Sequence, residues 1–384
     1  MLRTAILLPR SSLFPSIGID LLNGIKSCLK EYGIQEEITL LTDNIGYGLE
    51  EGDIYTKAER FILQEDADLV IVVADIRIAE LLHPLFTASN KLLMIVNCGA
   101  NYPESWNAAP TTLVLSLNFC LHARLTGKMA ALENDNKKGA YAVSYYDAGY
   151  RQCYSLLNSH HKNGGIPAFT HVTHLKATEF TLAPLAEFIE QNDDVKTLLC
   201  LFCGNMASQF YREVTPLQQQ FQLKLFGGPM MFDETIFNGE QVIMPAISGH
   251  TPWVSELDNE YNKTFKRSFQ QLPGKKTNLF ALLGWEAGLF IRNILQHCKA
   301  GTTAADEILP LLCKQDIESP RGWLKTDPDT FHVYGASWLV SCSENGEITI
   351  IKEASGVEEE WKLFTSETWP AGESSGWRNT YLCI

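Results

Sequence analysis

A regular alternation of strand-like and helix-like segments constrains the fold of this 384-residue chain more than any other feature. Short apolar runs typical of buried strands are separated by segments with helical spacing, the first marked by Ile17, Leu21, Leu22 and Ile25. In the first third, the expected strands lie at 3–9, 37–44, 67–75, 91–99 and 111–116. Strands joined by helices in this order form a parallel sheet with helices on both faces.

The same alternation restarts after a long helical pattern at 118–134. The expected strands of this second half lie at 139–147, 167–175, 197–204, 223–228 and 242–249, with helical patterns between most of them. A chain of this length exceeds one ordinary core, so two domains are expected. The predicted fold class is α/β, with two doubly wound parallel-sheet lobes in series.

The last third of the chain is expected to be helical first and β-like afterwards. Helical patterns lie at 255–271, 279–298 and 309–314, and β-like stretches at 322–327, 332–342 and 347–353. The segment at about 352–384 carries three tryptophans among turn residues. It is predicted to be an irregular surface extension.

Charge and composition narrow the class of protein. The formal net charge of −14 disfavours a broad nucleic-acid surface, which needs clustered Lys and Arg. No apolar run approaches the roughly 20 residues that span a membrane, and no signal peptide precedes the first strand. Ten cysteines, most of them in apolar runs, are typical of a reducing compartment. The sequence predicts a cytoplasmic protein, or a periplasmic one if a signal peptide has been removed.

Nucleotide and catalytic motifs are absent from the sequence. The opening loop, PRSSLFPS at 9–16, lacks the glycines that let backbone N–H groups approach a phosphate. Cys200 and Cys203 have redox spacing, but both are expected to pack within one apolar strand. We therefore expect no catalytic residue, no metal site and no cofactor.

Polar and aromatic residues gather where the expected parallel strands end. Six such loops lie at 9–12, 73–77, 98–102, 145–150, 202–206 and 227–233. In open α/β sheets, ligands bind outside the carboxyl ends of the strands. Each loop alone is better explained as an ordinary turn, but six loops in two duplicated halves favour a two-lobed small-molecule binder.

Several segments carry a resemblance to a known family. They are GIDLLNGIKSCLKEYG (18–33), LVIVVAD (69–75), LLMIVNCGANYP (92–103), YYDAGYRQ (145–152), LFGGPMMFDE (225–234) and LLGWEAGLFI (282–291). Over about residues 2–350 the chain resembles the type I periplasmic-binding-protein fold, in particular the branched-chain amino acid (Leu/Ile/Val) receptors of ABC transporters. This fold family also includes cytoplasmic amide-sensing regulators and receptor ligand-binding domains.

The resemblance implies a topology with three crossovers between the lobes. Lobe one would comprise about 1–117 and 250–325, and lobe two about 118–249 and 326–384. A ligand would bind between the lobes, with hinge closure. Carried over position by position, the resemblance and the strand-end loops predict these ligand-binding residues: Arg10, Ser11, Ser12, Asp75, Arg77, Gly99, Ala100, Asn101, Tyr102, Tyr150, Cys203, Gly204, Pro229, Met230 and Trp285.

Two departures from the family pattern bear on the ligand. Asp75 stands where amino acid receptors usually place hydroxyl residues, and it would repel a carboxylate unless Arg77 or a bridging cation offsets its charge. Pro229 and Met230 stand where an acidic residue often holds an amino group. A ligand with an aromatic or apolar component is favoured by Met230, Met231, Phe232, Tyr102 and Tyr150.

The predicted function is non-catalytic binding of an amino-acid-, amide- or aromatic-acid-like solute. The partner would be an ABC permease or a regulatory protein, and a homodimer is possible in the sensor case. Two alternatives stay open: an α/β enzyme of transferase type with a cleft active site, and a structural interaction module that uses the Trp-rich tail.

Overall fold

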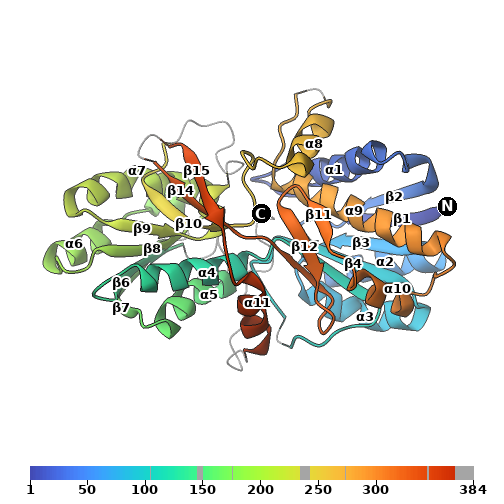
Figure 1. The fold of residues 1–384 in the computed structure, drawn as a ribbon, viewed down its shortest axis with the longest axis horizontal. Helices are drawn as coiled ribbons and strands as arrows, with labels where there is room; N and C mark the ends of the chain where they lie inside the picture. The colour runs from blue at the N-terminus through green and yellow to red at the C-terminus, as the bar shows by residue number, and fades with distance from the viewer. Residues whose placement is uncertain are drawn as a thin grey trace. The chain divides into compact units, whose positions relative to one another are not determined.

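The computed structural model describes residues 1–103, 105–144, 150–174, 176–233, 243–272, 274–343 and 346–367. The chain divides into two compact units. Unit 1 comprises Met1–Leu117 and Leu257–Gly335, and unit 2 comprises Asn118–Glu256 and the described residues from Ala336 onward (Figure 1). Within the described residues the chain therefore passes between the units three times, so the expected three crossovers are confirmed.

Unit 1 is built on an eight-stranded sheet in the order β11-β12-β13-β5-β4-β3-β1-β2. The strands are β1 (Leu2–Leu8), β2 (Ile38–Asn44), β3 (Leu69–Val73), β4 (Leu92–Asn97), β5 (Thr112–Ser116), β11 (Ile317–Ser319), β12 (Gly322–Thr326) and β13 (His332–Gly335). The five strands from the first third are parallel, as expected, and β13 joins them parallel to β5. β11 and β12 pair antiparallel, which makes the sheet mixed.

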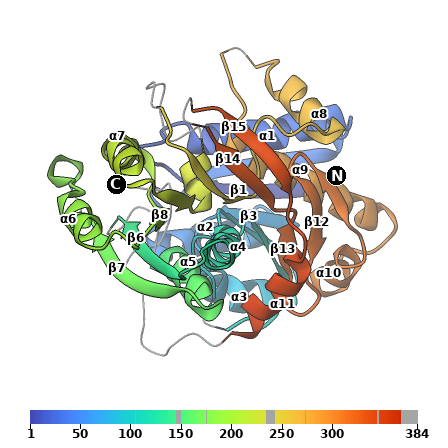
Figure 2. The same cartoon turned by 60° about the vertical axis from the view of Figure 1, so that its left-hand side comes forward.

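Helices cover both faces of this sheet: α1 (Ile17–Glu31), α2 (Glu51–Leu63), α3 (Arg77–Ser89), α8 (Glu260–Phe269), α9 (Leu279–Lys299) and α10 (Ala305–Leu312), with a 3-10 turn at Gln35–Glu37. One core packs α2 and α3 against β1, β3 and β4 through fully buried residues such as Phe61 and Phe86. On the other face α1 and α9 lie side by side (Figures 1 and 2). This approach needs glycine, because a Cβ at Gly284 would lie 2.0 Å from the carbonyl oxygen of Leu21.

Unit 2 is built on a seven-stranded sheet in the order β15-β14-β10-β9-β8-β6-β7. Its strands are β6 (Lys138–Val143), β7 (Ile166–Val172), β8 (Thr197–Leu201), β9 (Lys224–Gly227), β10 (Ile247–Thr251), β14 (Trp338–Cys342) and β15 (Ile348–Glu353). Its helices are α4 (Phe119–Leu132), α5 (Tyr150–Lys162), α6 (Ala183–Gln191), α7 (Gly204–Phe221) and α11 (Val357–Ser366), with 3-10 turns at Ala177–Glu179 and Pro229–Phe232. The sheet is parallel from β7 to β10, and antiparallel at the β14 and β15 edge.

The predicted α/β class with two doubly wound lobes is confirmed, with corrections to individual segments. The strand expected at 242–249 lies instead at Ile247–Thr251, and the stretch at 332–342 is two strands that belong to different units. Cys203 does not continue the strand of Cys200, because β8 ends at Leu201 and Cys203 caps α7.

The predicted irregular extension at about 352–384 is wrong over Val357–Ser366, where the structure has helix α11. Trp361 is 1% exposed, since it lies on the apolar face of this helix together with Val357 and Phe364. Arg124 of α4 holds the helix in place through ion pairs with Glu360 and Glu367 at 2.7 and 2.8 Å. The rest of the extension, 368–384, lies outside the described residues. In the described part of the chain, no helix is long and apolar enough to cross a membrane.

Candidate functional site

The loop after β3 carries a fixed ion pair. Asp75 is 6% exposed, and one of its oxygens, Oδ1, accepts hydrogen bonds from the backbone N–H and the Nε of Arg77, at 3.1 and 3.0 Å. Because Asp75 directly precedes the first turn of α3, its carboxylate also meets the positive end of the helix dipole. Arg77 thus already offsets the charge of Asp75. This is one of the two conditions under which an acidic ligand would not be repelled by Asp75.

The loop after β4 is tied to the same ion pair. Asn101 donates through Nδ2 to the second oxygen of Asp75, Oδ2, at 2.8 Å. The loop keeps its shape through Gly99, whose φ of 70° is a conformation that other residues adopt at a cost, and whose N–H donates to Asn97 Oδ1 at 2.9 Å. The structure therefore brings three of the predicted residues, Asp75, Arg77 and Asn101, into one hydrogen-bonded cluster in unit 1.

Two polar atoms of this cluster have no hydrogen-bond partner within the described ranges. They are the Nη2 donor of Arg77 and the Oδ1 acceptor of Asn101, both buried. Leaving such atoms unmatched costs about 1–3 kcal/mol each, more for a charged group. A guanidinium N–H and an amide oxygen are complementary to a group that both accepts and donates, such as a carboxylic acid derivative or an amide.

The loop after β1 differs in character. Arg10 is exposed, and its backbone N–H donates to the carbonyl of Gly46 at 2.6 Å. The Ser11 hydroxyl accepts from the N–H of Phe14 at 3.1 Å, so it closes the turn that leads into α1. Ser12 is exposed. Ser16 occupies the N-cap position of α1, and its hydroxyl donates to Asp20 at 2.7 Å in place of capping a backbone N–H.

Ala100 and Tyr102 are buried within unit 1. The Tyr102 ring stacks on Trp106, with centroids 6.1 Å apart and planes 12° apart. Trp106 in turn meets the ring of His332 edge-on at 5.0 Å. The Tyr102 ring, which was predicted to contact a ligand, therefore packs against another residue of its own loop.

In unit 2, the corresponding strand ends carry two residues that the sequence analysis did not single out. Ser144 follows β6, and its N–H donates to the carbonyl of Leu201 at the end of β8. Gln152 of α5 is 0% exposed, and neither amide atom has a hydrogen-bond partner in the described chain. A Cβ at Gly228, just past β9, would lie 3.6 Å from Gln152 Nε2. The orphaned amide therefore lies at the carboxyl ends of the parallel strands.

The other predicted residues of unit 2 are mostly interior. Cys203 is 3% exposed at the N-cap of α7, and Gly204 follows it with a φ of 55°. Pro229 begins the short 3-10 turn after β9, in which Met230 is fully buried. Nothing can be said of the side chain of Tyr150, which lies outside the described set.

Trp285 is not brought to the cluster around Asp75. Its ring is 2% exposed and packs against Phe265 of α8, with centroids 5.4 Å apart. Its neighbour Glu286 forms a fully buried ion pair with Arg321 at 2.8 Å, and Arg321 also donates to the carbonyl of Ser116 at the end of β5. Both α9 residues thus interact within unit 1, and the Oε2 atom of Glu286 has no hydrogen-bond partner among the described residues.

No group of three or more metal-ligating side chains occurs among the residues that the structure describes. His160, one of the clustered histidines in the sequence, bonds Tyr141 Oη through Nδ1 at 2.8 Å inside unit 2. Burial lowers the pKa of His160 to about 4. This histidine is a neutral core residue at physiological pH.

Comparison with known proteins matches this architecture. A protein-family model described as periplasmic binding protein matches residues 2–347. No curated protein matches the chain in sequence.

Three solved structures show the similarity of fold. A branched-chain amino acid ABC transporter periplasmic ligand-binding protein from Burkholderia xenovorans LB400 has a TM-score of 0.77 at 12% identity, covering 94% of this chain and 97% of that one. A solute-binding protein from Rhodopseudomonas palustris in complex with benzoate has a TM-score of 0.70 at 20% identity, covering 92% and 96%. Another, from R. palustris BisB5 in complex with 3,4-dihydroxybenzoic acid, has a TM-score of 0.72 at 14% identity, covering 92% and 97%.

Proposed function

Because the chain belongs to the periplasmic binding protein family, we propose that it binds a small organic acid at the loops after β3 and β4. Membership in a family of binding proteins makes this a non-catalytic solute binder and removes the transferase alternative. The observation that carries the proposal is the buried Arg77 Nη2, a charged donor fixed in place but without a partner in the described residues.

An acid fits this cluster better than a cation does. Asp75 already has its charge offset by Arg77 and accepts three hydrogen bonds, from Arg77 and Asn101. The remaining donor is cationic and planar, and it would bind a carboxylate oxygen through a charge-assisted hydrogen bond. Asn101 Oδ1 would accept from a hydroxyl, an amine or an amide N–H of the same solute.

Unit 2 offers a candidate contact residue of its own. Gln152 is the residue we expect to act there, since its buried amide would gain both a donor and an acceptor partner from a bound solute. The relatives named above bind benzoate and 3,4-dihydroxybenzoate, and aromatic acids are therefore one of the two classes to test, with amino acids the other.

The proposal also covers the cellular compartment of the protein and its macromolecular partner. Free thiols are carried by Cys28, Cys153, Cys200, Cys298, Cys313 and Cys342, and burial raises the pKa of Cys153 to about 12 and that of Cys342 to about 11. Protonated, buried thiols are compatible with a reducing cytoplasm and with a sensor that signals to a regulatory partner or a second copy. An ABC permease would be the partner of an exported form.

A ligand panel tests the proposal. Thermal shift and calorimetric titration would be run with benzoate, 3,4-dihydroxybenzoate, leucine and the matching amides. We expect at least one acid to raise the unfolding midpoint in a concentration-dependent way. Arg77→Gln should abolish that shift, whereas Arg267→Gln, at an exposed ion pair with Glu31, should preserve it. Unchanged binding by Arg77→Gln would contradict the proposal.

A further inference from the structure

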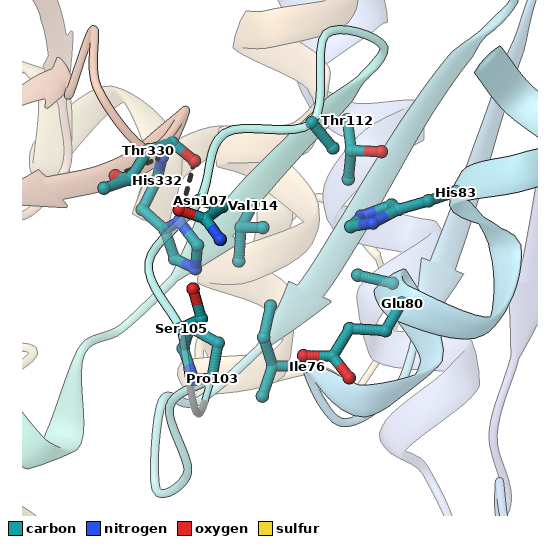
Figure 3. Close-up of a pocket in the computed structure, with 12 residues that line it drawn as sticks. Ile76, Glu80, His83, Pro103, Ser105, Asn107, Thr112, Val114, Thr330 and His332 are labelled. Atoms are coloured by element: carbon teal, nitrogen blue, oxygen red, sulfur yellow. Dashed lines mark hydrogen bonds between the residues drawn. The ribbon is translucent and has the colours of Figure 1, made fainter. Parts of the chain in front are cut away.

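We propose that unit 1 has a second binding site, a pocket between α3, β5 and the start of β13, that takes a small primary amine with a ring-sized apolar body. The pocket has a volume of about 220 Å³. Figure 3 shows Glu80, His83 and His332 directed toward the same space, beside Ile76 and Val114. This proposal is independent of the acid site proposed above.

The apolar part of the pocket sets the size of its occupant. Ile76, Ala79, Pro103, Ala109 and Val114 supply aliphatic surface on several sides. A cavity of about 150 Å³ is enough to hold a benzene ring, so this one has room for a ring with a short polar substituent. Burial of such a ring supplies the non-specific part of the binding free energy.

The polar lining of the pocket, which also includes Ser105 and Asn107, contains several hydrogen-bond acceptors. Glu80 carries an exposed carboxylate on α3. His332 Nδ1 lies 3.0 Å from the carbonyl oxygen of Thr330, which can only accept, so Nδ1 carries the proton and Nε2 is an acceptor. Thr112 is 3% exposed, and within the described residues its hydroxyl has no hydrogen-bond partner. This orphaned group lines the pocket and can accept from an ammonium N–H.

The charge of the lining selects an amine over an acid. None of the twelve described residues that line the pocket is a lysine or an arginine. Burial lowers the pKa of His83, and it lowers that of His332 to about 4, so both imidazoles are neutral at pH 7. Glu80 is then the one charged group among the lining residues that the structure describes, and Asp327 adds negative potential at His332. An ammonium ion would be attracted, and a carboxylate would be repelled.

The pocket is separate from the Asp75 cluster, although the two share segments of chain. Ile76, Ala79, Glu80 and His83 follow the i, i+3, i+4, i+7 spacing of one helix face. Arg77, which belongs to the acid site, is not among the pocket residues. Pro103 of the pocket lies two residues beyond Asn101 of the acid site. The two sites can therefore be distinguished by mutation.

Three probes of similar shape and different charge test the site: benzylamine, benzyl alcohol and benzoate, titrated by calorimetry or ligand-observed NMR at pH 7.5. We expect benzylamine to bind and Glu80→Gln to weaken it about tenfold, the loss of one charge-assisted hydrogen bond. Ala109→Phe should block the pocket and abolish amine binding. The matched control Glu36→Gln, at an exposed site of unit 1, should leave amine binding unchanged.

The acid-site variant Asp75→Asn separates the two proposals. Benzylamine should bind this variant as it binds the unmodified protein, whatever happens to acids. Loss of amine binding in Asp75→Asn, or its retention in both Glu80→Gln and Ala109→Phe, would overturn the assignment of the pocket. Absence of benzylamine binding to the unmodified protein would overturn it as well, without bearing on the acid site.

Discussion

Asn101 donates to Asp75 at 2.8 Å and thereby joins the loop after β4 to the loop after β3. Through this bond, and the 3.0 Å contact from Arg77 Nε, one buried carboxylate orients two side chains, one at the start of α3 and one in the loop after β4. We therefore propose that Asp75 is a positioning residue, whose charge orients the guanidinium of Arg77.

Asp75→Asn should weaken binding of an acid by about tenfold, because the guanidinium of Arg77 would lose its charge-assisted anchor. Calorimetric titration with the acid identified in the panel would measure this. Asp53→Asn is the matched control, since Asp53 forms an exposed pair with Lys57 at 2.7 Å on α2. Tighter binding by Asp75→Asn would show that the carboxylate acts by repulsion and would refute the positioning role.

Gln152→Leu should separate stability from binding. The buried amide has no partner in the described residues, so an apolar side chain of similar size should leave the free energy of unfolding unchanged or raise it by up to about 2 kcal/mol. Solute affinity should fall at least tenfold, by the loss of one or two hydrogen bonds. Urea unfolding and titration measure the two effects, with exposed Gln219→Leu as control. A clear loss of stability with normal affinity would mean that Gln152 is structural.

Glu286→Gln should destabilise unit 1 by about 3–5 kcal/mol, because it leaves the fully buried Arg321 with an uncompensated charge. Arg321 also donates to the Ser116 carbonyl at 3.0 Å, next to the first crossover between the units. The loss of stability should therefore extend to the end of β5. Chemical denaturation followed by circular dichroism gives the change in free energy. A loss below about 1 kcal/mol, the range of exposed pairs, would rule out this role.

Gly284→Ala should destabilise the protein by about 3 kcal/mol or more, because its Cβ would lie 2.0 Å from the Leu21 carbonyl oxygen and push α1 and α9 apart. Gly52→Ala is the matched control on α2, where nothing lies within 4 Å of the added Cβ. That change should stabilise by about 0.5–1 kcal/mol, the usual gain in helix propensity. Similar effects from both substitutions would exclude a close helix crossing.

Stability should fall as the pH drops from about 6.5 to 4. Burial lowers the pKa of His160, His250 and His332 to about 4, whereas in the unfolded chain the same groups take up protons near 6.5. The unfolded state therefore binds more protons in this window, and each histidine can withdraw up to about 3 kcal/mol of stability. Urea midpoints measured from pH 7.5 to 4 would show the slope. In His160→Phe the slope should be smaller, and an identical slope would contradict the assignment.

Much of the fold was predictable because its signals are local. The five residues of β3 are all buried and apolar, and the strand could be identified from its own sequence. The rule that ligands sit at the carboxyl ends of parallel strands pointed to Asp75, Arg77 and Asn101 as candidates, and the structure brings them together.

The rest depends on contacts between residues far apart in the chain. Gln152 stands out only once its neighbours are known to leave its amide without a partner. Trp285 is a residue type that often contacts ligands, but its position on α9 places its ring against Phe265. Helix α11 was missed because its amphipathic face is short and its anchor, Arg124, lies more than two hundred residues earlier.

The close crossing of α1 and α9 also bears on how the protein is made. Helix α1 leaves the ribosome with an apolar face and Gly24 exposed, and the helix that covers it ends only at Lys299. At a synthesis rate of about 5–20 residues per second, α9 is complete on the order of ten to fifty seconds after α1. Nascent chains of intermediate length would therefore depend on chaperones. A chain truncated before α9 would be degraded by proteases, because it could not form a smaller folded domain.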